Sequence, residues 1–132
     1  MSYKHNILKE RFDLIIDTPS AVKKAEWELD KNADKLFGIM VTSDNETHLY
    51  YRGSQKIQIN DQELFPEDFE SKLLMSGLGV APNNRVVRIG YVNTGNNKVE
   101  VWFKDTPHPS APFAAYRVTF YFFSQVKPAY LA

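Results

Sequence analysis

The chain has no cysteine, no net charge and no long hydrophobic run, and each absence excludes a class of protein. Without cysteine there is no disulfide, no thiolate metal site and no cysteine nucleophile. Sixteen basic residues balance sixteen acidic residues, so bulk charge does not predict binding to nucleic acid. The longest apolar stretch, residues 118–123, is as long as a strand and far shorter than the roughly 20 residues that span a bilayer.

The N-terminal residues lack the apolar segment of a secretion signal, because charged residues interrupt every apolar pair. We therefore expect a chain that folds in a cytoplasm and has no membrane span. Its 132 residues have the length of one domain, so we expect a single domain over residues 1–132. Hydrophobic residues make up 43% of the chain and aromatic residues 14%, which is enough to build a core without disulfides.

Hydrophobic and polar residues alternate along most of the chain. Val99, Val101 and Phe103, for example, alternate with charged residues, which places them on one face of a strand. Turn residues separate these runs at intervals of about 8–12 residues, a pattern typical of an all-β sandwich or barrel. The expected strands are residues 9–17, 22–30, 36–42, 47–51, 55–60, 69–75, 85–92, 98–104 and 115–124.

Two segments also fit a helix. Residues 20–34 begin with Ser20, a good helix cap, but the alternation of Ala25, Trp27 and Leu29 favours a strand. Residues 67–76 contain an apolar spacing that suits one or two helical turns as well as a strand.

No motif in the chain completes a catalytic or metal-binding site. His5, His48 and His108 lie in unrelated surroundings, so a zinc site is not expected. The chain has no Gly-x-Ser-x-Gly nucleophile elbow, and no segment supplies a nucleophile, a base and oxyanion donors together. We therefore expect a protein that is not an enzyme and has no cofactor, no bound metal and no catalytic residues.

Acidic residues gather in two places that resemble sites. The densest group could hold Ca²⁺ but lacks EF-hand spacing, which favours a solvated loop; its members are Glu63, Glu67, Asp68 and Glu70. Glu26 and Glu28 share a strand face at a spacing that suits a glycosidase pair, although exposed glutamates on a wet face are far commoner.

Aromatic residues occupy both faces of the last expected strand. Phe120 and Phe122 lie on one face, whereas Tyr121 and Phe123 lie on the other. A strand that is apolar on both sides is either covered on both sides or contacts a partner. We therefore predict a subunit interface that contains Tyr50, Trp102, Tyr121 and Phe123. The alternatives are a second face covered by the chain's own N-terminal segment or Pro-rich loop, and a sugar-binding platform built from Trp102 and tyrosines.

The order of these segments resembles a known family. Residues 27–31 (WELDK) run into residues 36–43 (LFGIMVTS), and residues 57–60, 64–69, 80–85 and 116–123 follow. This layout is similar to that of the small single jelly-roll proteins of viral capsids, such as those at the vertices of tailless bacteriophages. The resemblance implies about eight strands in two antiparallel sheets, self-assembly into a ring that is pentameric at a vertex, and no catalysis. It also implies an N-terminal arm, residues 1–10, that reaches a neighbour.

These observations predict a non-enzymatic structural protein of a virion, a vertex or minor capsid component that forms a homo-oligomeric ring. Its expected partners are further copies of itself and other capsid proteins, with no specific nucleic acid. The alternative is a carbohydrate-binding β-sandwich module that presents Tyr50, Trp102 or loop asparagines to a glycan. The expected location is the virion, and the alternative location is the cytoplasm.

Overall fold

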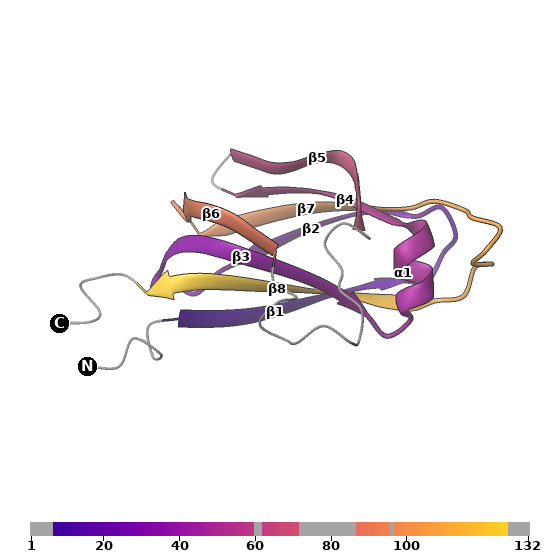
Figure 1. Cartoon of the computed structure of the whole chain (residues 1–132), viewed down its shortest axis with the longest axis horizontal. Coiled ribbons are helices and arrows are strands. Elements are labelled where there is room, and N and C mark those ends of the chain that lie inside the picture. Colours follow the sequence, from indigo (N-terminus) through magenta and orange to yellow (C-terminus); the bar gives the residue numbers. More distant parts are fainter. Residues whose placement is uncertain (1–6, 60–61, 72–86, 96, 127–132) are drawn as a thin grey trace.

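The computed structural model describes residues 7–59, 62–71, 87–95 and 97–126. These residues form eight strands and one short helix (Figure 1). In chain order they are β1 (Ile7–Ile16), β2 (Val22–Glu28), β3 (Ala33–Ser43), α1 (Glu46–Arg52), β4 (Gly53–Ile59), β5 (Gln62–Glu70), β6 (Val87–Asn93), β7 (Lys98–Asp105) and β8 (Tyr116–Val126).

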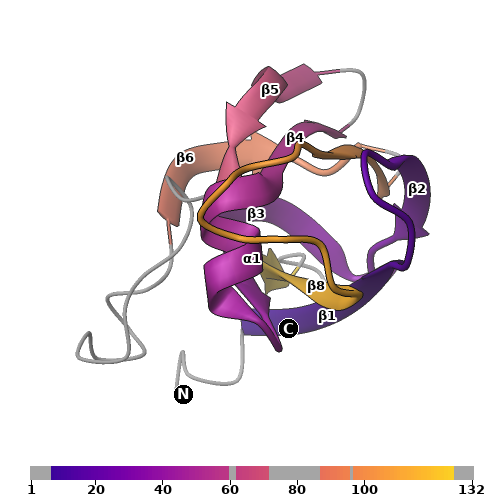
Figure 2. The ribbon, with the colours of Figure 1, turned by 90° about the vertical axis from the view of Figure 1, so that its right-hand side faces the viewer.

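The strands pair into two antiparallel sheets of four strands each. Sheet A has the order β1-β8-β3-β6, and sheet B has the order β2-β7-β4-β5. The first strand therefore pairs with the last, the second with the seventh, the third with the sixth and the fourth with the fifth. This nested pairing is the topology of a single jelly roll, and it confirms the predicted all-β, two-sheet fold. Figure 2, viewed along the strands, shows the sheets facing each other with α1 at one end.

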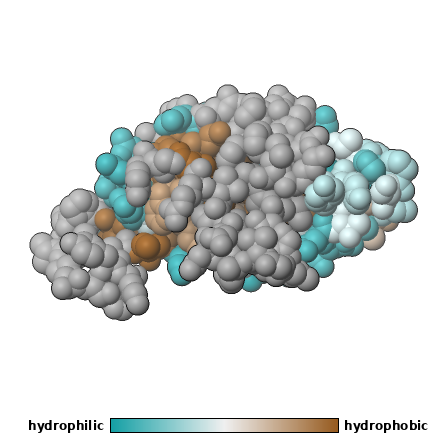
Figure 3. Space-filling view, in the orientation of Figure 1, coloured by the Kyte–Doolittle hydropathy of each residue, from teal (hydrophilic) through white to brown (hydrophobic). Residues whose placement is uncertain are grey.

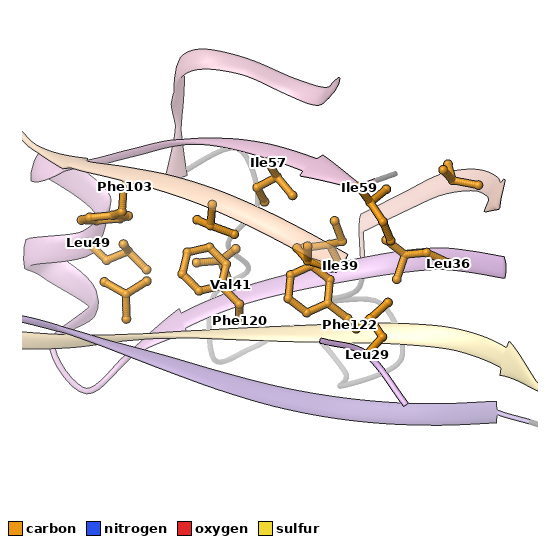
Figure 4. Packing of buried hydrophobic residues seen from close by; sticks show 14 of the residues in the cluster. Leu29, Leu36, Ile39, Val41, Leu49, Ile57, Ile59, Phe103, Phe120 and Phe122 are labelled. Carbon is orange, nitrogen blue, oxygen red and sulfur yellow. The ribbon is translucent and has the colours of Figure 1, made fainter. Parts of the chain in front are cut away.

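The space between the sheets is filled by the inward residues of the alternating pattern (Figure 4). Phe120 and Phe122 of β8 are fully buried there, as are Val101 and Phe103 of β7. The β1–β2 side of the sandwich is closed by Trp27, whose ring stacks on Phe12 with centroids 4.9 Å apart. Residues that alternate in the sequence thus supply one continuous core, as expected for strands with one dry face.

Residues 20–34 contain β2, so the strand interpretation of this segment is confirmed and the helix interpretation is wrong. The expected strand at residues 69–75 is misplaced, because β5 already begins at Gln62 and ends at Glu70, and residues 72–75 lie outside the described part of the chain. Pro66 is accommodated in β5 because this strand is an edge of sheet B.

The expected strand at residues 47–51 is wrong, because this segment forms the helix α1. The helix begins after Asn45, whose side-chain oxygen accepts a hydrogen bond from the backbone N–H of His48 at 3.2 Å. Glu46 in the first turn and Arg52 in the last turn have the charges that the helix dipole favours. These end signals outweigh the strand preference of the aromatic residues between them.

The predicted N-terminal arm, residues 1–10, is corrected in part. Residues 7–10 belong to β1 and pair with β8, where Leu8 lies opposite Ser124. Residues 1–6 lie outside the described part of the chain.

Candidate functional site

The outer face of sheet A carries two of the four aromatic residues that the sequence predicted for an interface. Tyr121 and Phe123 alternate with the buried Phe120 and Phe122 and are themselves only half-buried. On the neighbouring strand β3, Met40 lies opposite Tyr121 and is also half-buried. The centre of this face therefore keeps part of its aromatic surface exposed.

The flanks of the same face are apolar at both ends of β1. Ile7 is 42% exposed and Ile15 is 54% exposed, and both alternate with the inward residues of that strand. Figure 3 shows the molecule from the direction of Figure 1, where hydrophobic residues gather over β6 and the end of β8. The end that carries α1 is paler and more hydrophilic in the same view. Exposed apolar residues are also found outside sheet A, since Val22 of β2 in sheet B is 67% exposed.

Positive charge surrounds the aromatic centre of sheet A. The outward strand residues with described side chains include four basic residues and one acidic residue, a net charge of +3: Lys9, Arg11, Lys35 and Arg117 against Asp13. Asp13 pairs with Arg11 at 3.2 Å and accepts a hydrogen bond from Thr119 at 2.6 Å. The hydrogen bond from Thr119, together with Arg11, holds the pKa of Asp13 below its ordinary value. The remaining basic residues leave the face cationic.

The outer face of sheet B has a different character, because its charges are largely paired. Lys24 lies 3.4 Å from Glu26 and 3.5 Å from Glu100, and Lys98 lies 3.3 Å from Glu26. The hydrogen bonds from Lys98 and Lys24 lower the pKa of Glu26. Glu26 thus belongs to a network of surface ion pairs.

Trp102 lies in the middle of this outer face of sheet B. Its ring has the ammonium groups of Lys24 and Lys56 at 5.0 and 4.9 Å from its centroid. Both lysines are its direct neighbours in the sheet, on β2 and β4. Two lysines therefore make cation–π contacts with the Trp102 ring. The ring lies on a different surface from Tyr121 and Phe123, because β7 belongs to sheet B and β8 to sheet A.

Tyr50 lies on a third surface, at the end of the sandwich. It is 48% exposed on α1 and contacts Tyr51, with ring centroids 5.0 Å apart. Tyr51 in turn lies 4.8 Å from the ring of His108. The structure therefore brings Tyr121 and Phe123 together but separates them from Tyr50 and Trp102. Sequence reasoning missed Tyr51 and His108 as a cluster because it expected a strand where α1 forms.

A buried ion pair fixes the end of the sandwich on which these aromatic residues lie. Arg52 donates to Asp105 through Nε at 3.0 Å and through a terminal nitrogen at 2.8 Å, and both side chains are almost completely buried. Asp105 also accepts from the Tyr116 hydroxyl at 2.5 Å and from the Ser20 N–H at 2.9 Å. Arg52 donates further to the backbone carbonyl of Ala111 at 2.9 Å. The carboxylate of Asp105 thus ties α1, β7, β8 and the β1–β2 turn together, and Arg52 adds the loop after β7.

These contacts shift the titration of Asp105 and Tyr116. Burial alone would raise the pKa of Asp105, but the hydrogen bonds from Arg52 and Tyr116 outweigh it and lower the pKa. Burial, followed by the hydrogen bond to Asp105, raises the pKa of Tyr116. The pair is therefore charged at neutral pH, and the tyrosine is a neutral donor.

Within the described ranges, no three or more His, Cys, Asp or Glu side chains are placed to hold a metal ion. His5 and the side chains of the predicted acidic cluster in β5 lie outside what the structure describes. No helix in the described part of the chain is both long enough and apolar enough to cross a membrane. Comparison of the chain with family models, with curated proteins and with solved structures finds no match.

Proposed function

We propose that this chain is a non-enzymatic structural protein that assembles into a ring of identical copies, as a vertex or minor component of a virion capsid. The observation that carries the proposal is the half-buried pair Tyr121 and Phe123, on an inner strand of a jelly-roll sheet whose other side is the core. Aromatic residues of this kind are enriched in protein interfaces. Jelly rolls are an architecture of capsid and lectin domains, so the fold is compatible with this function.

A second candidate is a carbohydrate-binding module, since lectin domains share the architecture. The observation that favours it is the exposed Tyr50–Tyr51 pair beside His108 on the α1 end. Trp102 does not extend this platform, because it lies on the outer face of sheet B between two lysines. A glycan array separates the two functions, because binding to an array sugar is expected only for the module.

The assembly function predicts that the double variant Tyr121→Ser with Phe123→Ser loses the oligomer but keeps its fold. Both side chains are half-buried, so we expect unfolding free energy to fall by only about 1–2 kcal/mol. Size-exclusion chromatography with light scattering measures the oligomer mass, and chemical denaturation measures the stability.

The matched control for this experiment is Tyr50→Ser with Tyr51→Ser, which removes two exposed rings from the α1 end. We expect this control to keep the oligomer mass of the wild type. A wild-type protein that stays monomeric at millimolar concentration would contradict the proposed function. An oligomer lost equally in both double variants would contradict the assignment of the interface to sheet A.

A further inference from the structure

We propose that the outer face of sheet A binds single-stranded nucleic acid of any sequence, by stacking bases on Tyr121 and Phe123 and by pairing phosphates with the cations around them. This binding activity goes beyond the proposed function, because it gives the face a ligand other than a second copy of the chain. A single strand and a second copy cannot cover the same rings at once, so the two are expected to compete.

The aromatic part of the site is a pair of rings on one strand. Tyr121 and Phe123 point outward from β8, and both are half-buried. β8 is an inner strand of sheet A, between β1 and β3, so the rings lie in the middle of the sheet and not at its margin. Stacking on such rings tolerates any base, because every base has a π-face.

Basic side chains border these rings directly. In the register of β1 and β8, Lys9 lies opposite Phe123 and Arg11 lies opposite Tyr121. Lys35 lies on the other neighbouring strand, β3, beyond the two rings. The cationic border of the site consists of Lys9, Arg11, Lys35 and Arg117, which together with Asp13 give the described outer face a net charge of +3.

Most of this positive charge has no counter-charge beside it. Arg11 forms an ion pair with Asp13 at 3.2 Å. Among the described residues, no carboxylate lies within ion-pair distance of Lys9, Lys35 or Arg117. Arg117 also has a buried Nε that no acceptor in the described part of the chain reaches. Because the whole chain has no net charge, this excess is a local feature of one face, and phosphate groups supply the anions that it lacks.

The spacing of the rings selects a single strand over a duplex. Tyr121 and Phe123 are two residues apart on β8, which places their Cα atoms about 7 Å apart. Bases within a duplex are about 3.4 Å apart along the axis and already stacked and paired, so only unpaired bases can stack on both rings. A sheet with aromatic residues at its centre is a recurring platform for single-stranded RNA.

The depth of the side chains favours a nucleic acid over an anionic membrane. A membrane-binding face needs apolar side chains that reach past the polar ones into the acyl region. On this face the rings are half-buried, whereas Lys9 and Arg11 are exposed. A strand with flat bases and outer phosphates fits this arrangement better than a lipid surface does.

Fluorescence anisotropy with a labelled oligothymidylate of about 12 nucleotides tests the proposal on the complete chain. We expect Tyr121→Ser with Phe123→Ser to weaken binding by about 30-fold or more, because the bases lose the rings on which they stack. The matched control, Tyr50→Ser with Tyr51→Ser, removes two exposed rings from the α1 end and is expected to leave binding unchanged.

The salt dependence of binding tests the phosphate contacts. With about three such contacts, an increase from about 0.05 M to about 0.2 M salt is expected to weaken binding about 20-fold. Lys9→Gln with Lys35→Gln should reduce that factor to about threefold, because about one contact remains. Lys56→Gln with Lys104→Gln removes the same charge from the outer face of sheet B and should leave the factor unchanged. Circular dichroism melting checks the fold of each variant, and the lysine variants test the site if the serine variant fails to fold.

Light scattering then tests the competition, since saturating oligothymidylate is expected to convert a wild-type oligomer into single copies. A wild-type monomer that binds the oligonucleotide overturns the assembly function and leaves this inference standing. A wild-type protein that does not bind it, even when diluted to single copies, overturns the inference and leaves the assembly function standing. Equal binding to a duplex, binding that the sheet A variants do not change, and binding to phosphatidylserine vesicles alone each overturn the inference as well.

Discussion

Arg52→Met is expected to destabilise the fold by about 3–5 kcal/mol, because it leaves the carboxylate of Asp105 buried without its cation. Both partners are almost completely removed from water, so solvent cannot replace the lost hydrogen bonds. The loop carbonyl of Ala111 loses its donor as well. Urea denaturation at neutral pH, followed by circular dichroism, measures this loss.

The double variant Arg52→Met with Asp105→Asn is the control for this experiment. It removes both charges, so we expect a loss of stability smaller than the sum of the two single losses. Tyr116 and the Ser20 N–H donate to different oxygens of Asp105, so the carbonyl oxygen of an asparagine can keep the bond from Ser20 while its amide group donates to the Tyr116 hydroxyl. Strictly additive losses would contradict a direct coupling between Arg52 and Asp105.

The same ion pair predicts a dependence of stability on pH. The pKa of Asp105 is lower in the folded protein than in the unfolded chain, where the pKa of an aspartate is about 3.9. Its contribution is therefore complete above that value and is lost as the pH falls through the folded pKa. We expect the stability gap between wild type and Asp105→Asn to narrow below about pH 4. A gap that stays constant in acid would contradict this assignment.

The sequence predicted the fold well because a period of two depends only on local geometry. The alternation in residues 98–104 and 116–123 placed the correct residues inside, and both segments are strands. The α1 segment was mispredicted because Leu49, Tyr50 and Tyr51 suit a strand, whereas the capping contact of Asn45 decides the local structure. Such a contact is one hydrogen bond, and the composition of the segment does not reveal it.

The candidate site was predictable only where one strand contains it. Tyr121 and Phe123 follow from the alternation of β8 alone. The cationic border combines residues from β1, β3 and β8, which are neighbours only because the first and third strands both pair with the last. The Arg52–Asp105 pair joins residues 53 positions apart, and no local pattern marks it.

Phe122→Ala is expected to destabilise the fold by about 3–5 kcal/mol, whereas Phe123→Ala, one position along, is expected to cost much less. Phe122 is fully buried, and its ring lies 5.8 Å from that of Phe12 and 6.3 Å from that of Trp27. Its removal opens a cavity beneath the aromatic cluster that closes the β1–β2 side of the core. Phe123 points to the opposite side of the same strand and is half-buried, so its removal leaves no cavity in the core.

The two variants are compared by urea denaturation and by the mass of the oligomer. Phe122→Ala should lower the midpoint of unfolding strongly, and the folded fraction that remains should still assemble, because the outer face of sheet A is unchanged. Phe123→Ala should reverse this pattern, with a small change in the midpoint and a weaker oligomer. Equal losses of stability in the two variants would mean that both faces of β8 are enclosed within one copy. The reason for placing a second copy on sheet A would then be gone, because an enclosed ring offers no surface for it to cover.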